Sequence, residues 1–368
     1  MKKFIPVASP FINHLEAKAV YRTIKSGWIS MGRKVEEFED RVCKYVGCKY
    51  AIGMNNGTST LDALLTAMNI TEQDEIIVPS LTYIASANVV QYKKAKLVLC
   101  DIDPATFNTN VEYIKKKITK KTKLIIVTDM KGMPVDYDSF TKLSKMYRIP
   151  IIGDSAESFG ALYKGKKVGS QFLAHSFSFF ANKNITTGEG GMILTNNLSL
   201  YKKLKIIRNQ GQQGRYNHVV LGNNYRMTDI QATIGIEQLK KLNKILKSKE
   251  RVAKNYFKKF HKMEGVLLPF IPTYVSQHSW YNFAIKVNSK IRNKLVNYLK
   301  KKGIETRMSF PCIHTQAYYV KKFKYKKNDF PNSSKTFDQL IDLPIWAGLS
   351  LKNQSFIVSS IKKFFNKN

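Results

Sequence analysis

The sequence predicts an α/β protein with a mostly parallel central sheet, followed by a smaller C-terminal α+β domain. Two observations favour this class. Near-continuous apolar runs of strand length alternate with helix-patterned segments, and the pattern then changes to short strands and helices. Such alternation is typical of a sheet covered by helices on both faces. The chain has 368 residues, 43% of them hydrophobic, which is enough for two domains with cores of ordinary size.

Apolar runs define the expected strands, and helix-patterned segments at 111–118 and 137–148 separate some of them. The strands are expected at 74–80, 95–103, 122–130, 149–156, 174–180 and 191–197. In such sheets ligands bind at the carboxyl ends of the strands. Four aspartates at or near those ends are therefore candidate functional residues: Asp101, Asp103, Asp129 and Asp154.

A long helical stretch at 227–260 follows these strands and can bridge a large domain to a smaller one. Beyond it, short elements are expected at 280–287 and 292–303. We therefore predict a large domain over residues 1–240 and a small domain over 241–368.

The net charge is +35, from 61 Lys and Arg against 26 Asp and Glu. A charge of this size is compatible with a polyanionic partner such as nucleic acid or an anionic surface. The lysines are spread along the chain, however, without zinc-finger spacing, an RNA-binding signature or a basic tail. The pattern favours a solvated basic surface, and nucleic-acid binding stays open as an alternative function from another class.

The four cysteines form no CxxC pair and no cluster with histidine, so neither a disulfide framework nor a metal site is expected. The N-terminal segment lacks the apolar run of a signal peptide, and no window approaches the length of a membrane span. We expect a soluble, cytoplasmic protein without a membrane partner.

Lys183 stands out in the stretch HSFSFFANKNITTGEGGM, behind Phe179 and Phe180 and ahead of a glycine-rich turn. Burial disfavours the charged form of a lysine, and a neutral amine can condense with an aldehyde. A surface lysine at a strand end is the alternative for such a stretch taken alone.

Two further features support a chemical role for Lys183. Asp154 ends an apolar strand, where a buried carboxylate needs a cationic partner, although a helix cap would also explain it. Gly57 and Thr58 precede a helical pattern, where free amides can hold a phosphate, although an ordinary capped helix start is the alternative. An amine, an acid for a ring nitrogen and a phosphate cradle are together what a pyridoxal 5'-phosphate (PLP) enzyme needs.

Ordered motifs over about residues 5–365 resemble the DegT-type, PLP-dependent nucleotide-sugar aminotransferases. The resemblance implies the type I fold of aspartate aminotransferase. The motifs that carry it are SGWISMGRKVEEFE (26–39), NNGTSTLDALLTAM (55–68), DEIIVPSLTYIASANVV (74–90), DIDPATF (101–107), GDSAESFGALYKGKKVGS (153–170), FSFFANKNITTGEGGMILTNN (177–197), YNHVVLGNNYRMTDIQATIG (216–235) and GIETRMSFPCIHTQAYY (303–319).

The resemblance implies a role for each matching residue. Lys183 matches the lysine that forms a Schiff base with PLP, Asp154 the acid facing the pyridine nitrogen, and Glu157 a position near the phenolic oxygen. The remaining matches hold the phosphate or stack on the ring: Ser178, Gly57 and Thr58 for the phosphate, Tyr83 for the ring, and Asn224 for the phosphate of the partner subunit in a homodimer with shared active sites.

Residues in segments that line the sugar-nucleotide pocket of relatives are Trp28, Ser30, Arg215, His218, His314 and Tyr318. For His314 a structural position in the core or on the surface is an equal alternative. The 128–138 segment departs from the family pattern, with Asp129, Lys131 and Met133 where His, Tyr and a polar residue are usual.

A related branch that removes a sugar hydroxyl has histidine at the position of Lys183, so the lysine favours transamination. The resemblance implies transfer of the amino group of L-glutamate to C4 of a nucleotide-linked 4-keto-6-deoxy sugar. Amination at C3 by the same residues is the alternative, and the nucleotide and the stereochemistry of the product stay open.

Overall fold

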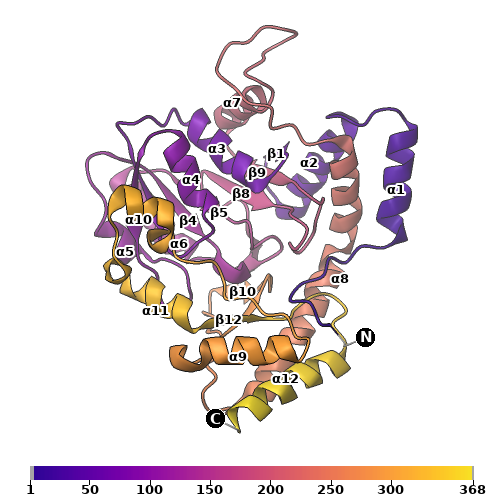
Figure 1. Ribbon diagram of the computed structural model, residues 1–368. Helices are drawn as coiled ribbons and strands as arrows, with labels where there is room; N and C mark the ends of the chain where they lie inside the picture. The colour runs from indigo at the N-terminus through magenta and orange to yellow at the C-terminus, as the bar shows by residue number, and fades with distance from the viewer. Residues whose placement is uncertain (1–3, 367–368) are drawn as a thin grey trace.

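The computed structural model describes residues 4–366 and contains two domains joined by one long helix (Figure 1). Within these residues a large sheet has the strand order β1-β9-β8-β5-β4-β2-β3. The strands are β1 Tyr50–Met54, β2 Glu75–Pro79, β3 Lys96–Cys100, β4 Thr122–Thr128, β5 Ile151–Asp154, β6 Leu162–Tyr163, β7 Lys166–Lys167, β8 Ala174–Ser178, β9 Gly191–Thr195, β10 Val275–Gln277, β11 Phe283–Lys286 and β12 Leu340–Leu343.

The helices are α1 His14–Lys25, α2 Arg33–Val46, α3 Gly57–Ala67, α4 Ala85–Tyr92, α5 Val111–Lys115, α6 Tyr137–Tyr147, α7 Leu198–Arg208, α8 Asp229–Phe260, α9 Ser289–Lys301, α10 Ala317–Phe323, α11 Pro331–Gln339 and α12 Leu351–Phe365. Short 3₁₀ turns occur at Met130–Gly132, Ile313–Thr315 and Lys327–Asp329.

The central sheet is mostly parallel, as the sequence predicts. Strands β8, β5, β4, β2 and β3 run parallel to one another, while β9 is antiparallel to both of its neighbours, β8 and β1. Each of the predicted strands is present, with its ends at most three residues from those expected. The strand β1 was not anticipated, and it pairs with β9 at the edge of the sheet.

Helices cover both faces of this sheet. On one face α3, α4 and α7 pack over a core that includes Leu64, Ile126 and Leu204. On the other face α2, α6 and α8 pack over a second core that includes Phe38 and Phe140. This layered arrangement is the one that the alternating apolar pattern predicts.

The long helix α8 begins with a capping box, in which Thr228 accepts from the amide of Gln231 and the Gln231 side chain accepts from the amide of Thr228. It spans 32 residues, which corresponds to about 48 Å. Its first half packs on the large domain, and its second half joins the small-domain core through Val252 and Tyr256. Residue 240, our predicted boundary, therefore falls inside a helix that both domains share.

The small domain is built on an antiparallel pair of strands, β11 and β12, covered by α9, α12 and the end of α8 (Figure 1). The segment that contains α10 lies between α9 and β12 in sequence but packs back on the large domain through Tyr319. Among residues 4–366, no helix is both long and apolar enough to cross a membrane.

Candidate active site

A cavity of about 600 Å³ opens at the carboxyl ends of the central strands, beside the N-terminus of α3. This is the end of the sheet at which parallel α/β proteins bind ligands. The cavity brings together the predicted catalytic lysine and most of the predicted cofactor residues: Lys183, Asp154, Glu157, Ser178, Gly57, Thr58 and Tyr83.

Lys183 lies in the irregular segment between β8 and β9, with its side chain half-buried in the cavity wall. Phe179 before it is fully buried, whereas Phe180 is partly exposed and lines the cavity. The amine of Lys183 lies 4.2 Å from the centre of the Tyr281 ring. Burial lowers the pKa of Lys183, and the nearby carboxylates of Glu157 and Asp154 act in the opposite direction. The structure therefore does not support the alternative of a solvent-exposed lysine at a strand end.

Asp154 is the last residue of β5 and is 8% exposed. It accepts a hydrogen bond of 2.5 Å from the hydroxyl of Ser86. Burial raises the pKa of Asp154, while this hydrogen bond and the charge of Lys183 oppose the rise. No helix begins at Asp154, so the alternative of a helix cap does not apply.

Glu157 is also buried, and one of its oxygens accepts the backbone amide of Lys131 at 2.6 Å. Its other oxygen, Oε1, is buried and has no hydrogen-bond partner among residues 4–366. Burial is the main cause that raises the pKa of Glu157. Buried polar atoms are nearly always paired, so a lone carboxylate oxygen beside this cavity fits a site completed by a bound group.

The start of α3 forms the opposite side of the cavity. Asn56 caps the helix by accepting from the amide of Ser59, which leaves the amides of Gly57 and Thr58 at the first two helical positions. A side chain at position 57 would come within 3.0 Å of the Cβ of Ser178. Glycine therefore keeps open a space lined by amides and a hydroxyl, which suits a phosphate. Helix capping and phosphate binding are both compatible with this segment.

Tyr83 lies at the cavity with 52% of its surface exposed, tilted against Phe310 at a ring-centre distance of 5.1 Å. Phe310 comes from the segment after α9 and was not among the predicted residues. An exposed aromatic ring at this position is free to stack on a planar ligand.

Seven predicted residues lie outside this cavity in the single chain, and five of them are in exposed loops. Arg215 and His218 belong to an exposed loop that projects beyond α7 (Figure 1). Asn224 is exposed near the base of the same loop, and its carbonyl accepts from the Asn55 side chain at 3.4 Å. The other two, Trp28 and Ser30, are exposed between α1 and α2.

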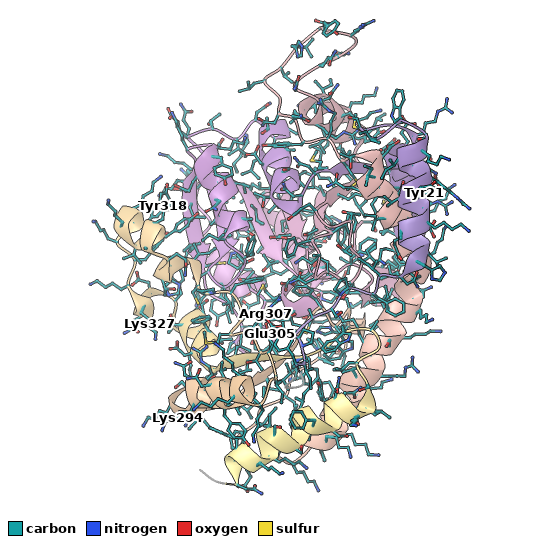
Figure 2. The ribbon with its side chains drawn as sticks, turned by 45° about the vertical axis from the view of Figure 1, so that its right-hand side comes forward. Tyr21, Lys294, Glu305, Arg307, Tyr318 and Lys327 are labelled. Atoms are coloured by element: carbon teal, nitrogen blue, oxygen red, sulfur yellow. The ribbon has the colours of Figure 1, made fainter. Side chains whose placement is uncertain are left out.

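His314 is fully buried, and its two ring nitrogens lie 2.5 Å from the hydroxyl of Ser80 and 2.9 Å from that of Ser334. Both nitrogens are thus occupied inside the protein, so the structure supports the alternative of a core histidine and not a substrate contact. Tyr318 is exposed on α10 at the edge of the molecule (Figure 2). It lines a second hollow of about 630 Å³, which shares Tyr92 with the first cavity.

The strand-end aspartates divide into two groups. Asp101 accepts from Ser333 at the start of α11, and Asp103 accepts from the amide of Ala105, so both support local structure. Asp129 is buried beside the cavity and accepts hydroxyl groups from Tyr137, Ser155 and Ser158 at 2.6–2.8 Å. Asp129 thereby fixes the turn that carries Asp154 and Glu157.

Sequence reasoning missed other residues around the site. Lys131, noted only as a departure from the family pattern, forms a buried ion pair with Asp342 of the small domain at 2.8 Å. Lys249 and Tyr281 surround the segment of Lys183. Asp342 and Tyr281 lie in the C-terminal part of the chain, and no local motif marks any of these positions as part of the site.

The two-domain fold, the lysine amine and the buried carboxylates together define a PLP-dependent aminotransferase with the type I fold. A family model described as the DegT/DnrJ/EryC1/StrS aminotransferase family matches residues 10–362. The chain belongs to this family, as its motifs indicated.

Named relatives agree with this assignment. The chain is 37% identical to the GDP-perosamine synthase of Escherichia coli O157:H7 over 368 residues, covering 99% of each chain. It is 39% identical to the GDP-perosamine synthase of Caulobacter vibrioides over 322 residues, covering 86% of this chain and 87% of the relative. The PLP form of Spr1654 from Streptococcus pneumoniae is similar in structure, with a TM-score of 0.94, 29% identity and 99% coverage of both chains. The protein is a sugar aminotransferase, and its cofactor is PLP.

Proposed function

We propose that this enzyme transfers the amino group of L-glutamate to C4 of a nucleotide-linked 4-keto-6-deoxy sugar of the perosamine or viosamine type. The observation that carries the proposal is the single cavity that holds Lys183, Asp154 and Glu157 beside the start of α3. The choice of C4 is supported by the relatives named GDP-perosamine synthase, which match the chain at 37% and 39% identity.

Each residue then has a distinct task. Lys183 would hold the aldehyde end of PLP through its amine and would move a proton to and from the reacting carbon. The carboxylate of Asp154 would pair with the pyridine nitrogen, and the oxygen of Glu157 that has no partner among residues 4–366 would gain one near the phenolic oxygen. When bound, PLP supplies an aldehyde for the amine and a ring that accepts the electrons of a carbanion.

The remaining residues bind and orient. The amides of Gly57 and Thr58 and the hydroxyl of Ser178, which all line the cavity, would hold the cofactor phosphate, and Tyr83 would stack on its ring. Tyr318 contacts the sugar nucleotide from the neighbouring hollow. The positive net charge of +35 accelerates capture of an anionic sugar nucleotide.

The active enzyme is a homodimer in this proposal. The support is a set of exposed apolar side chains on α1, after α1 and on the loop beyond α7, where Tyr21 is 61%, Trp28 63% and Leu221 90% exposed. Figure 2 shows Tyr21 on the outer side of α1. Burial of these side chains in a dimer also accounts for Trp28, Ser30, Arg215, His218 and Asn224, which a partner subunit would bring to the second cavity.

The direct test has two parts. Borohydride reduction of the PLP-loaded protein, followed by peptide mass spectrometry, is expected to place the label on Lys183, and Lys183→Ala is expected to abolish both label and turnover. Incubation with L-glutamate and a panel of 4-keto and 3-keto sugar nucleotides is expected to give an aminated product only from a 4-keto sugar. Amination of a 3-keto sugar alone would establish the 3-aminotransferase instead, and a Lys183→Ala variant that still turns over would overturn the assigned role of the lysine.

A further inference from the structure

A second buried lysine lies close to Lys183 and has no evident role in the proposed chemistry. Lys249, in the middle of α8, is only 4% exposed. Its amine donates to the side-chain oxygen of Asn184 at 2.7 Å and to the carbonyl of Tyr281 at 3.3 Å. No carboxylate among residues 4–366 lies within 4.0 Å of this amine, so an ammonium group here has no ion-pair partner. An unpaired buried charge is costly, so its position calls for a reason.

Both acceptors of Lys249 adjoin Lys183. Asn184 is the next residue in the chain, and its amide nitrogen donates to the carbonyl of Ser279 at 2.9 Å. Tyr281 has its ring 4.2 Å from the Lys183 amine, and its hydroxyl donates to Asn182 at 3.2 Å. Because Lys183 lies outside any helix or strand, these contacts fix the course of its segment.

We propose that Lys249 is a positioning residue for Lys183. Lys249 holds the residues on either side of the Lys183 amine and carries positive charge in place of that amine. This proposal rests on the function of Lys183 proposed above. Two neighbouring buried amines repel each other when both are charged, so the pair favours a single proton. Whenever Lys249 holds that proton, Lys183 is neutral and nucleophilic.

The electrostatics support this arrangement. Burial, with a further contribution from the charge of Lys183, lowers the pKa of Lys249 to about 7. The other titratable groups around the pair are His278 beside Lys249, whose pKa burial lowers to about 3, and the groups that act on Lys183. Glu157, Asp154 and Tyr83 raise the pKa of Lys183, and Arg307 lowers it. His278 therefore stays neutral near pH 7, and the single charge is exchanged between the two lysines.

The rate at which PLP attaches to the cofactor-free protein tests this directly. Attachment joins the neutral amine of Lys183 to the aldehyde carbon and releases one water, and borohydride followed by mass spectrometry measures its extent. In Lys249→Met the alternative site for the proton is lost, so attachment is expected to slow on the order of tenfold at pH 7, since a neighbouring charge shifts a pKa by a unit or more. Near pH 9.5, where Lys249 is neutral in the wild type, the two rates are expected to converge.

Three further variants separate charge from structure. Lys249→Gln keeps a donor for Asn184 without charge and is expected to show the same pH-dependent slowing. Lys249→Arg stays charged at every pH and is expected to attach PLP at pH 7 at least as fast as the wild type. Lys247→Met, an exposed position on the same helix, is the matched control and is expected to change nothing.

The outcomes distinguish the two proposals. If Lys249→Met and Lys249→Gln attach PLP more slowly by the same factor at every pH, or attach it at the wild-type rate, the exchange of charge between Lys249 and Lys183 is overturned. Failure of the wild type itself to attach PLP at Lys183 would overturn the proposed function instead.

Discussion

Replacing Asp342 by asparagine removes the negative charge from the ion pair that joins the two domains beneath the active site. The amine of Lys131 lies 2.9 Å and 2.8 Å from the two oxygens of Asp342, and their side chains are 3% and 1% exposed. The Asp342 carboxylate also accepts the Asn282 amide at 3.0 Å, which the variant can retain. Asp342→Asn thus leaves a buried ammonium without its counter-charge, which typically costs about 3–5 kcal/mol.

Urea unfolding of the cofactor-free protein measures this cost. Lys131→Met is expected to lose a similar amount, because it leaves the Asp342 carboxylate buried and unpaired. The double variant Lys131→Met/Asp342→Asn is expected to be more stable than the sum of the single losses predicts, since neither charge then lacks a partner. The exposed pair of Lys164 and Asp138 is the control, and its Asp138→Asn variant is expected to leave the unfolding midpoint unchanged. Single losses that add without any coupling would refute the reasoning.

Two further predictions concern the phosphate cradle and a buried histidine. Gly57→Val is expected to weaken PLP binding at least about tenfold, since the new side chain would meet Ser178 where the phosphate is proposed to lie. A fluorescence titration measures the affinity, and an unchanged affinity would contradict the proposed phosphate site. Burial lowers the pKa of His175 to about 3, below the value of an unfolded histidine, so the unfolded chain binds more protons between pH 6.5 and 3. The free energy of unfolding is therefore expected to decrease as the pH falls through this window, by up to about 1.4 kcal/mol per pH unit from this group. Urea unfolding of His175→Gln is expected to show a smaller dependence of this free energy on pH.

Local sequence patterns predicted the elements that form the base of the active site. Strands buried on both faces produce apolar runs, and these runs located β2, β3, β4, β5, β8 and β9. Family motifs located Lys183, Asp154 and Ser178, because each lies at or just beyond the end of such a strand. Strand β1 lacked so clear a signal, since its run YAIGM is short and contains a glycine.

Contacts between distant parts of the chain could not be predicted in this way. Lys131 and Asp342 are 211 residues apart, and only the docking of the two domains makes them partners. His314 matched a substrate-binding segment, but Ser80 after β2 and Ser334 of α11 occupy its two ring nitrogens. The same limit applies to Lys249, whose helical position is evident but whose acceptors depend on tertiary packing.

The sequence by itself determined the order of the strands along the chain and the long helix, because spacing and hydrophobicity encode local structure, and its motifs marked Lys183 as the candidate lysine. The tertiary structure alone decided which charges surround that lysine and which predicted residues reach the cavity. The physical reason is that burial and electrostatic coupling depend on distances through space, which residues far apart in the chain acquire only after it has folded.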